Sequence, residues 1–529
     1  MVKRLLAVGA VLTSLSLATA ACGGGEVRGA GGTGAAADDT FVYAFNLNVV
    51  TEWDPAESYS NEIIAMENLY ESLTGYDSTS EEVTPRLATE WSSSEDGLTW
   101  TFTLRDGVTF HSGRALDATA AKQSIERTIE LGGGPAYIWD AVKKIEATDE
   151  RTLVFHLDYA TPLDLVASSA YAAYIYDVEA AGDRDLAEWL DEGNDAGSGP
   201  YTVASWEPGA ETELRLEAYD DYWGGWEDDQ YRAVEFRVTP EVTTAWQLLQ
   251  SGDIDYVERL SPQLFAQAAD TDGVQTSEQS SFQNLLALFN TADGPLADEQ
   301  VRKALRLLID VPGLVAALDG AVVAADGVVP AGLLGAGEGY VLEQDVEAAR
   351  SLLAEAGYDE ANPLELTMTY AQGDDDQQLF ATLLGSALAE VGGSLEAKPM
   401  QWNAQWKQAT KGERQDIFVM YWYPDYADAY SWFANIFRSS DEPYFNLTYL
   451  EDAEVDQQID ALPVLTATDP ESAAATYGKL QDELVTGQAA VAPLFVQTYQ
   501  RAYADSVEGY VDNPAYPNVV FVHELTNAG

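Results

Sequence analysis

The sequence predicts an α/β protein whose lobes alternate strands with helices, and three observations support this class. The 529 residues suffice for two to four domains at ~100–200 residues each. Hydrophobic residues make up 46% and aromatic residues 11% of the chain, which is enough to build a core and argues against a disordered acidic polymer. Strand-like runs also alternate with helix-length amphipathic segments in both halves of the chain.

In the first half, the spacing of apolar residues predicts each element in turn. The expected elements are a strand and exposed loop over 41–48, a helix over 62–73, a hairpin over 98–110, a helix over 115–130, strands over 151–159 and 231–240, and a helix, glycine and strand over 241–257. The hairpin turn is placed at Asp106-Gly107, a dipeptide that tight turns favour. Asp117 or Thr119 is the expected N-cap of the helix that follows.

The second half continues the same alternation. The expected elements are a strand over 284–290, helices over 298–310 and 345–358, a strand over 363–370, a helix over 377–393 and a buried strand over 415–422. The Gly-rich run 197–201 lacks the lysine and the helix that phosphate binding needs, so it is expected to be a turn into a strand. No internal repeat is found.

Charge limits the possible partners. Lys and Arg number 27 and Asp and Glu number 88, which gives a formal charge of −61. Nucleic-acid binders and proteins that dock on anionic lipid need clustered basic residues, so both classes are excluded. Such acidity fits work in concentrated salt, where a Debye length of ~3 Å at ~1 M suppresses repulsion between carboxylates. An alkaline habitat and an ordinary acidic surface are the alternatives.

The N-terminus has the pattern of a bacterial lipoprotein signal. Lys3 and Arg4 precede an apolar run over 5–17 that is too short to span a bilayer of ~30 Å, and small residues then lead to Cys22. We therefore expect a signal peptide over 1–21, lipidation of Cys22 and a flexible Gly- and Ala-rich tether over 22–37. As the only cysteine, Cys22 rules out an intramolecular disulfide. The mature chain is expected on the extracellular face of the cytoplasmic membrane, or in the periplasm, where the lipid on Cys22 anchors it.

Catalytic and metal-binding patterns are absent from the sequence. The three histidines, His111, His156 and His523, lie far apart, and neither a zinc-protease motif, a nucleophile elbow nor a P-loop occurs. The acidic run 374–376 lacks the alternating spacing of a calcium loop and is expected to be a solvated loop. We therefore predict no enzyme activity, no cofactor and no metal. Structural roles are expected for His111 and His156.

An aromatic cluster marks the predicted site. Seven Trp and Tyr residues lie between positions 402 and 430, with Asp425 and Asp428 among them, directly after the apolar strand. Ligand sites of α/β folds lie at the ends of such strands. Aromatic faces bind peptide planes, sugars or cations, and a carboxylate there binds an ammonium group. Trp422 and Asp425 are the predicted ligand contacts, whereas Trp406 and Tyr423 are expected in the core.

The region from Pro85 to Arg127 closely resembles the signature of the family 5 extracellular solute-binding proteins of ABC importers. The matching positions are Pro85, Leu87, Ala88, Trp91, Asp96, Gly97, Trp100, Phe102, Leu104, Arg105, Gly107, Val108, Phe110, His111 and Gly113. Further segments match in the family's order, including 197–209, 288–310 and 345–358. The resemblance covers essentially the whole mature chain.

The resemblance implies a two-lobed periplasmic-binding-protein-like fold of type II. Lobe one is expected over 38–280, with an extra subdomain at about 61–196. Lobe two is expected over 281–489, and residues 490–529 return to lobe one. Chain crossings near 280–284 and 487–493 would form a hinge that closes the lobes on the ligand.

The resemblance also implies a peptide ligand and its contacts. Asp425 matches the aspartate that holds the ligand's ammonium group, and Trp422 and Trp402 match ligand-facing tryptophans. Tyr421 stands where the family has Gly, and Val419 stands where peptide binders can place a carboxylate-binding Arg. Asn48, in the loop after the first strand, is a further predicted ligand contact.

The expected partners are a peptide and an ABC permease with its ATPase, and the protein is expected to be monomeric. An oligosaccharide or nickel-chelate ligand, a sensing role and an extracellular hydrolase are the alternatives.

Overall fold

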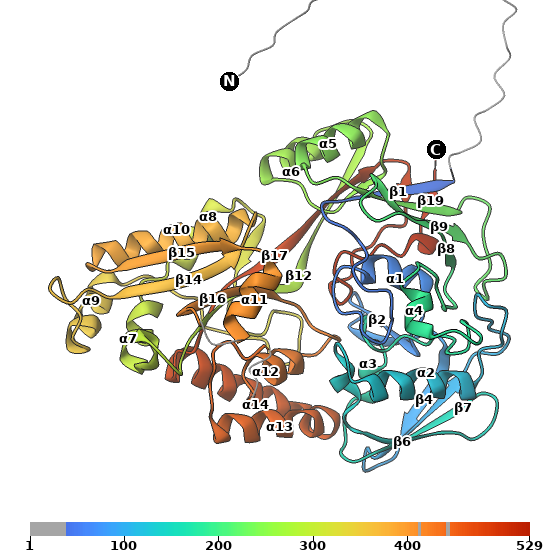
Figure 1. The fold of residues 1–529 in the computed structure, drawn as a ribbon, viewed down its shortest axis with the longest axis horizontal. Helices are drawn as coiled ribbons and strands as arrows, with labels where there is room; N and C mark the ends of the chain where they lie inside the picture. The colour runs from blue at the N-terminus through green and yellow to red at the C-terminus, as the bar shows by residue number, and fades with distance from the viewer. Residues whose placement is uncertain (1–38, 411–413, 441–444, 529) are drawn as a thin grey trace, which may run out of the picture. The chain divides into compact units, whose positions relative to one another are not determined.

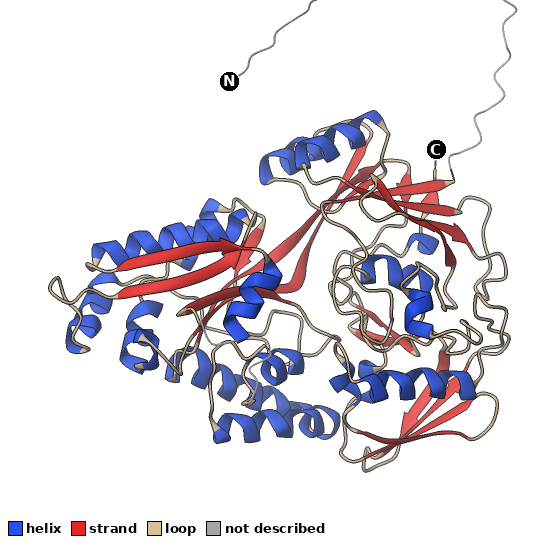
Figure 2. Ribbon diagram, in the orientation of Figure 1, coloured by secondary structure: helices blue, strands red, loops and turns tan. Residues whose placement is uncertain are grey.

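The structure, a computed structural model, describes residues 39–410, 414–440 and 445–528. It contains a large mixed sheet, a separate four-stranded sheet, and helices that cover both (Figures 1 and 2). The predicted signal peptide, Cys22 and the tether lie outside the described residues.

The large sheet has the strand order β15-β14-β16-β12-β17-β11-β1-β10-β9-β8, with β13 paired to β17. In chain order its strands are β1 (Thr40–Phe45), β8 (Tyr201–Trp206), β9 (Thr212–Ala218), β10 (Ala233–Val238), β11 (Tyr256–Val257), β12 (Val274–Phe289), β13 (Val322–Ala324), β14 (Glu365–Ala371), β15 (Ser394–Met400), β16 (Ile417–Trp422) and β17 (Val491–Ala504). We call the part built from β1, β8–β11 and their neighbours lobe one, and the part built from β13–β16 lobe two.

Two long strands connect the lobes. β12 and β17 run antiparallel and lie side by side along their length (Figure 1). Their register breaks between Ser280, which pairs with Thr498, and Asn284, which pairs with Val496. A register break bends a strand pair, and it coincides with the predicted first crossing at 280–284. The predicted domain boundaries themselves stay predictions.

The four-stranded sheet belongs to a subdomain of lobe one. Its order is β4 (Ala88–Ser93), β5 (Thr99–Leu104), β7 (Thr152–Leu157) and β6 (Val142–Ala147), and α2 (Ala118–Leu131) covers one face (Figure 2). Alternate side chains of β5 and β7 are buried in a core that includes Trp100, Phe102 and Phe155. Just before β4 in the chain, β2 (Thr74–Asp77) and β3 (Glu82–Pro85) pair to form a two-stranded sheet.

The predicted hairpin at Asp106-Gly107 is wrong. Both edges of β5 are occupied, by β4 on one side and by β7 on the other. Residues 108–110 therefore find no free edge to pair with, and Thr109 instead forms an isolated bridge with Ala115. Alternation of apolar residues identified the strand, but it carried no information on which strand would be its neighbour.

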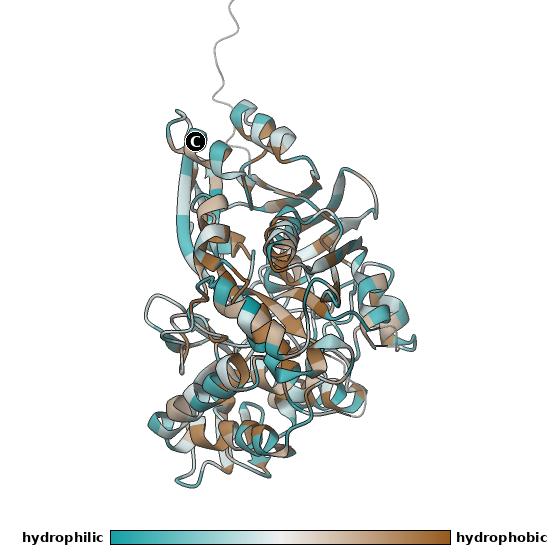
Figure 3. Ribbon diagram, turned by 90° about the vertical axis from the view of Figure 1, so that its left-hand side faces the viewer, coloured by the Kyte–Doolittle hydropathy of each residue, from teal (hydrophilic) through white to brown (hydrophobic). Residues whose placement is uncertain are grey.

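Most predicted helices form, with capping that agrees with their sequence. Asp117 accepts a hydrogen bond from the Ala120 amide at 2.8 Å, so it is the N-cap of α2. α5 (Val242–Ser251) ends at Gly252 with φ 76°, a left-handed conformation that glycine adopts without strain. In Figure 3 the helices carry both teal and brown residues, as amphipathic helices do.

The remaining helices complete the two lobes. Those of lobe one are α1 (Ile63–Leu69), α3 (Leu163–Val166), α4 (Leu186–Leu190) and α6 (Pro262–Ala269). Those of lobe two are α7 (Glu299–Arg306), α8 (Val311–Ala317), α9 (Val346–Glu355), α10 (Asp375–Glu390), α11 (Trp402–Thr410), α12 (Tyr430–Ile436), α13 (Ala453–Thr468) and α14 (Pro470–Gln481). The C-terminal pair β18 (Val507–Glu508) and β19 (Thr526–Asn527) follows β17, and Val520, Val522 and Leu525 pack in the core of lobe one.

Candidate ligand-binding cavity

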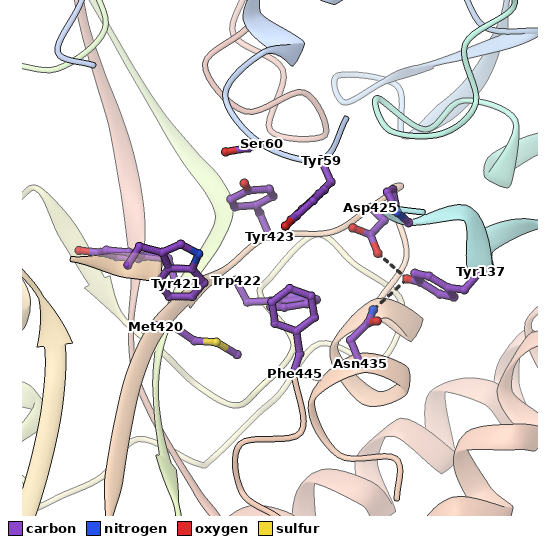
Figure 4. A pocket seen from close by; sticks show the side chains of 13 residues that line it. Tyr59, Ser60, Tyr137, Met420, Tyr421, Trp422, Tyr423, Asp425, Asn435 and Phe445 are labelled. Atoms are coloured by element: carbon purple, nitrogen blue, oxygen red, sulfur yellow. Dashed lines mark hydrogen bonds between the residues drawn. The ribbon is translucent and has the colours of Figure 1, made fainter. Parts of the chain in front are cut away.

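A cavity of about 170 Å³ lies at the end of β16, with residues of both lobes around it. Seven of its lining residues are aromatic: Tyr59, Tyr137, Trp402, Tyr421, Trp422, Tyr423 and Phe445. Among the residues that the structure describes, Asp425 is the one acid that lines it, and Met420 and Asn435 also contribute. The rings of Tyr59 and Tyr423 lie on one side of the space, opposite Trp422 and Phe445 (Figure 4).

Strand β16 positions the aromatic wall. It pairs with β12 and β14, which hold it in the middle of the lobe-two part of the sheet. Because successive strand residues face opposite sides, Phe418, Met420 and Trp422 face one core and Ile417 and Val419 face another. Trp422 is 9% exposed, and its ring meets the Phe445 ring edge to face at 5.0 Å.

The carboxylate of Asp425 is held by neutral donors. The hydroxyl of Tyr137, a residue of the lobe-one subdomain, donates to Asp425 Oδ2. Burial raises the pKa of Asp425 to about 6, although hydrogen bonds from Tyr137 and Asn435 oppose the shift. Burial and the nearby Asp425 charge raise the pKa of Tyr137 well above its usual value. Tyr137 therefore stays protonated and acts as the donor.

Further bonds join the loop after β16 to lobe one. Asn435 Nδ2 donates to Tyr137 Oη at 3.0 Å, and the Ser169 hydroxyl donates to the main-chain carbonyl of Asp425. The ring of Tyr423 stacks on Tyr171 with centroids 6.2 Å apart. Tyr426 is buried in the core of the lobe-one subdomain. The segment 423–426 thus fixes the position of Asp425 relative to both lobes.

The structure brings four of the five predicted ligand contacts to this cavity. Asp425, Trp422, Trp402 and Tyr421 line it. Trp402 opens α11 and is 44% exposed. The Tyr421 hydroxyl approaches Asp376 Oδ2 at 3.4 Å, on the side of β16 away from Trp422. Asn48 is exposed in the loop after β1 and is not among the lining residues. The binding roles of all five stay predictions.

Two residues expected in the core have different surroundings. Trp406 packs against the core of lobe two, as expected, and its ring lies 4.7 Å from that of Phe445. Tyr423 packs against the same core and also lines the cavity. Alternation along a strand does not predict this double role, because Tyr423 follows the last residue of β16.

Sequence reasoning missed four residues of the cavity, two from lobe one and two from lobe two. Tyr59, Tyr137, Asn435 and Phe445 line the cavity, yet none stands in a pattern that marks a ligand site. Tyr137 belongs to a short 3-10 turn over 136–139, and 288 residues separate it from Asp425. Only knowledge of how the lobes pack identifies it.

The acidic run 374–376 is not the solvated loop that was predicted. Asp374 caps α10 by accepting from the Gln377 amide at 2.9 Å. Asp376 is 9% exposed, and its carboxylate pairs with Arg259 of lobe one at 2.7 Å. Only Asp375 is exposed. The partner of Asp376 is an arginine distant in sequence, which local patterns do not indicate.

His111 has the structural surroundings that were expected. Its ring bonds Asp195 and the Gly199 carbonyl, and the Asp195 charge raises its pKa. Within the described ranges, no group of three or more His, Cys, Asp or Glu is arranged to hold a metal ion. In the same part of the chain, no helix has the length and apolar character needed to cross a membrane.

Comparison with known proteins places these features in a family. The pattern of the bacterial extracellular solute-binding proteins, family 5, matches residues 82–444. A probable D,D-dipeptide-binding periplasmic protein, DdpA, of Escherichia coli is 28% identical over 87% of this chain and 88% of its own length. The dipeptide-binding protein DppE of Bacillus subtilis is 25% identical over 97% of both chains.

Solved structures show the same fold. The oligopeptide-binding protein AppA of Bacillus subtilis, solved with a nonapeptide, is 20% identical, and the match has a TM-score of 0.79 over 93% of this chain and 99% of the other. NikA of Brucella suis, solved with Fe(III)-EDTA, is 21% identical with a TM-score of 0.80 over 92% and 99% of the two chains. These likenesses confirm the predicted two-lobed fold, and the family consists of binding proteins rather than enzymes. The chain belongs to family 5 of the bacterial extracellular solute-binding proteins.

Proposed function

We propose that this protein is the substrate-binding component of an ABC importer and that it captures peptides outside the cell. The observation that carries the proposal is the placement of Asp425, whose carboxylate lies in an aromatic cavity where the described part of the chain supplies only neutral hydrogen-bond donors. A half-buried carboxylate without a cation is a receptor for an ammonium group. A peptide's N-terminus supplies that group, and both relatives named above are called dipeptide-binding proteins.

The surrounding rings suit the rest of a peptide. Trp402 and Trp422 would form walls against which a side chain or a peptide plane packs. An extended ligand would pair its main chain with protein groups in the manner of an added strand. Tyr137 would share the carboxylate with the bound ammonium, because Asp425 has two oxygens and several acceptor positions.

Capture would use motion of the lobes. The register break between Ser280 and Asn284 lies where the paired strands pass between the lobes, so bending there would open and close the cavity. Ligand would be enclosed on closure and then delivered to a permease. The bonds from Tyr137 and Ser169 to Asp425 join the two lobes and would break on opening.

The N-terminal pattern completes the proposal. Signal-peptide removal before Cys22 and lipidation of that residue would anchor the protein outside the cytoplasmic membrane, with residues 22–37 as a tether. Mass spectrometry of tryptic peptides from membrane-extracted native protein tests this, since a diacylglyceryl mass on an N-terminal Cys22 is expected. An N-terminus upstream of Cys22 would contradict it.

The experiment that tests the ligand class is native mass spectrometry of the protein purified without refolding. A peptide proposal predicts adducts whose fragmentation gives amino-acid mass ladders. Adducts that fragment to hexose units, or that carry a nickel isotope pattern, would replace peptide by the corresponding ligand. Neighbouring permease and ATPase genes would support transport over sensing.

A further inference from the structure

The charges of the residues that line the cavity limit which peptides can bind, beyond the general class of peptide ligands proposed above. Among the residues that the structure describes, Asp425 is the only acid lining the cavity, and none of the lining residues is Lys, Arg or His. A zwitterionic ligand brings a carboxylate as well as an ammonium group. The described lining offers a charged partner for the ammonium group, whereas a ligand carboxylate would find only neutral donors such as Ser60 and Asn435.

One cation connected to the cavity through hydrogen bonds, Arg259, is already paired. Arg259 forms an ion pair with Asp376 at 2.7 Å, and Asp376 in turn meets the hydroxyl of Tyr421, which lines the cavity. Arg259 is also held next to Glu258. Arg259 is not among the described residues lining the cavity, and the Asp376 carboxylate already offsets its charge, so it attracts a ligand carboxylate less than an unpaired guanidinium would.

Strand β16, which ends at Trp422, contributes no cationic side chain to the cavity either. Val419, three residues before Trp422, is 1% exposed and packs in the core on the other face of β16. Its partner on β12, Ala287, is apolar as well. β16 therefore contributes only apolar and aromatic groups to this end of the cavity.

A ligand carboxylate close to Asp425 would also be repelled. Two like charges a few ångströms apart in a half-buried site interact far more strongly than in water, and dissolved salt screens them poorly there. Burial already raises the pKa of Asp425 to about 6, with no contribution from another acid of the described chain. The aromatic walls, in contrast, favour cations and apolar groups.

From these contacts we infer that the cavity selects ligands that present an ammonium group beside an apolar or aromatic side chain and carry no free carboxylate within reach of it. Short peptides fit when their C-terminus is amidated, and longer peptides fit when their C-terminus lies beyond the cavity. A free dipeptide is disfavoured. This inference rests on the proposed function, because it assigns the substrate class of the same site.

Calorimetry with three probes tests the inference on the wild-type protein at pH 7, where the probes carry an ammonium group, and at constant NaCl. The probes are Phe-Ala as the free acid, Phe-Ala amide and the tetrapeptide Phe-Ala-Ala-Ala. We expect the amide and the tetrapeptide to bind at least tenfold more tightly than the free dipeptide. Equal or tighter binding of the free dipeptide would overturn the inference and leave peptide binding intact. Binding of none of the three would overturn both.

A variant separates charge from size. In Asp425→Asn the repelling carboxylate is gone, so the ratio of affinities for the amide and the free acid should fall towards one. An unchanged ratio would mean that another group discriminates between the two probes and would contradict the assignment to Asp425. Asp375→Asn, on the exposed first turn of α10, is the matched control and should keep the wild-type ratio.

Discussion

Tyr137 donates its phenolic hydrogen to the carboxylate of Asp425 across the two lobes, although 288 residues separate them in sequence. The bond satisfies a carboxylate that has no cation among the described residues lining the cavity. It also leaves Asp425 ionisable near neutral pH, because a neutral donor offsets only part of the burial effect on its pKa.

Ligand affinity should depend on pH through Asp425. The pKa of its carboxylate is raised to about 6 by burial, and a bound ammonium group stabilises the ionised form. Affinity for an amidated peptide should therefore be greatest near pH 7 and fall as the pH drops through 6, approaching tenfold per pH unit between the pKa values of the free and bound states. It should also fall above pH ~8, because the ligand's own α-amino group then loses its proton. Titration calorimetry between pH 4.5 and 8 measures this. A flat profile would show that an ionised Asp425 is not required.

Removal of the Tyr137 hydroxyl should shift that profile. Tyr137→Phe loses the hydrogen bond that favours the ionised carboxylate, so the pKa of Asp425 should rise and the midpoint of the affinity profile should move upward. Affinity at pH 8.5 should change by less than about threefold, since Asp425 is still ionised there. A variant with a uniform loss at all pH values would instead place Tyr137 in direct contact with the ligand.

Asp425 should also cost stability in the absence of ligand. Its folded pKa of about 6 lies above the ~3.9 of an unfolded aspartate, so folded protein binds the proton more tightly. This contribution favours the folded state below about pH 4, is lost as the pH rises through 6, and amounts to at most ~3 kcal/mol. Asp425→Asn should therefore raise Tm at pH 8 and have little effect at pH 4, by differential scanning calorimetry. A lower Tm at pH 8 would contradict this account.

The charge of −61 predicts a dependence on salt. If the acidic surface is adapted to concentrated salt, Tm should rise markedly from 0.1 M towards roughly 2 M NaCl, beyond the range in which simple screening saturates. The ion pair between Arg501 and Asp512, with side chains 2% and 1% exposed, should contribute little to this slope because salt does not reach it. A flat profile would favour an ordinary acidic surface.

The sequence predicted those elements whose structure depends on contacts between residues close together in the chain. Helix α2 with its Asp117 cap, the end of α5 at Gly252 and strand β16 followed from short-range patterns. The false hairpin at Asp106-Gly107 failed because the neighbours of β5 come from distant segments. The placement of Asp376 failed for the same reason, since its partner Arg259 lies in the other lobe.

The candidate site shows the same division. Trp422 and Asp425 follow a recognisable apolar strand, so residue type and position indicated them. Tyr59 and Tyr137 come from lobe one, and their sequence surroundings give no sign of a cavity. For a site between two lobes, the sequence can indicate the residues of the lobe that carries the motif. The residues that the other lobe contributes depend on how the two lobes pack.

The central claim is that the Asp425 carboxylate binds the ligand's ammonium group, and one calorimetric comparison tests it most directly. The affinity of Phe-Ala amide should be measured at pH 7 for the wild type, for Asp425→Asn and for the control Asp375→Asn. The account predicts at least a tenfold loss, about 1.4 kcal/mol, in Asp425→Asn and none in the control. An affinity of Asp425→Asn equal to that of the wild type would contradict it.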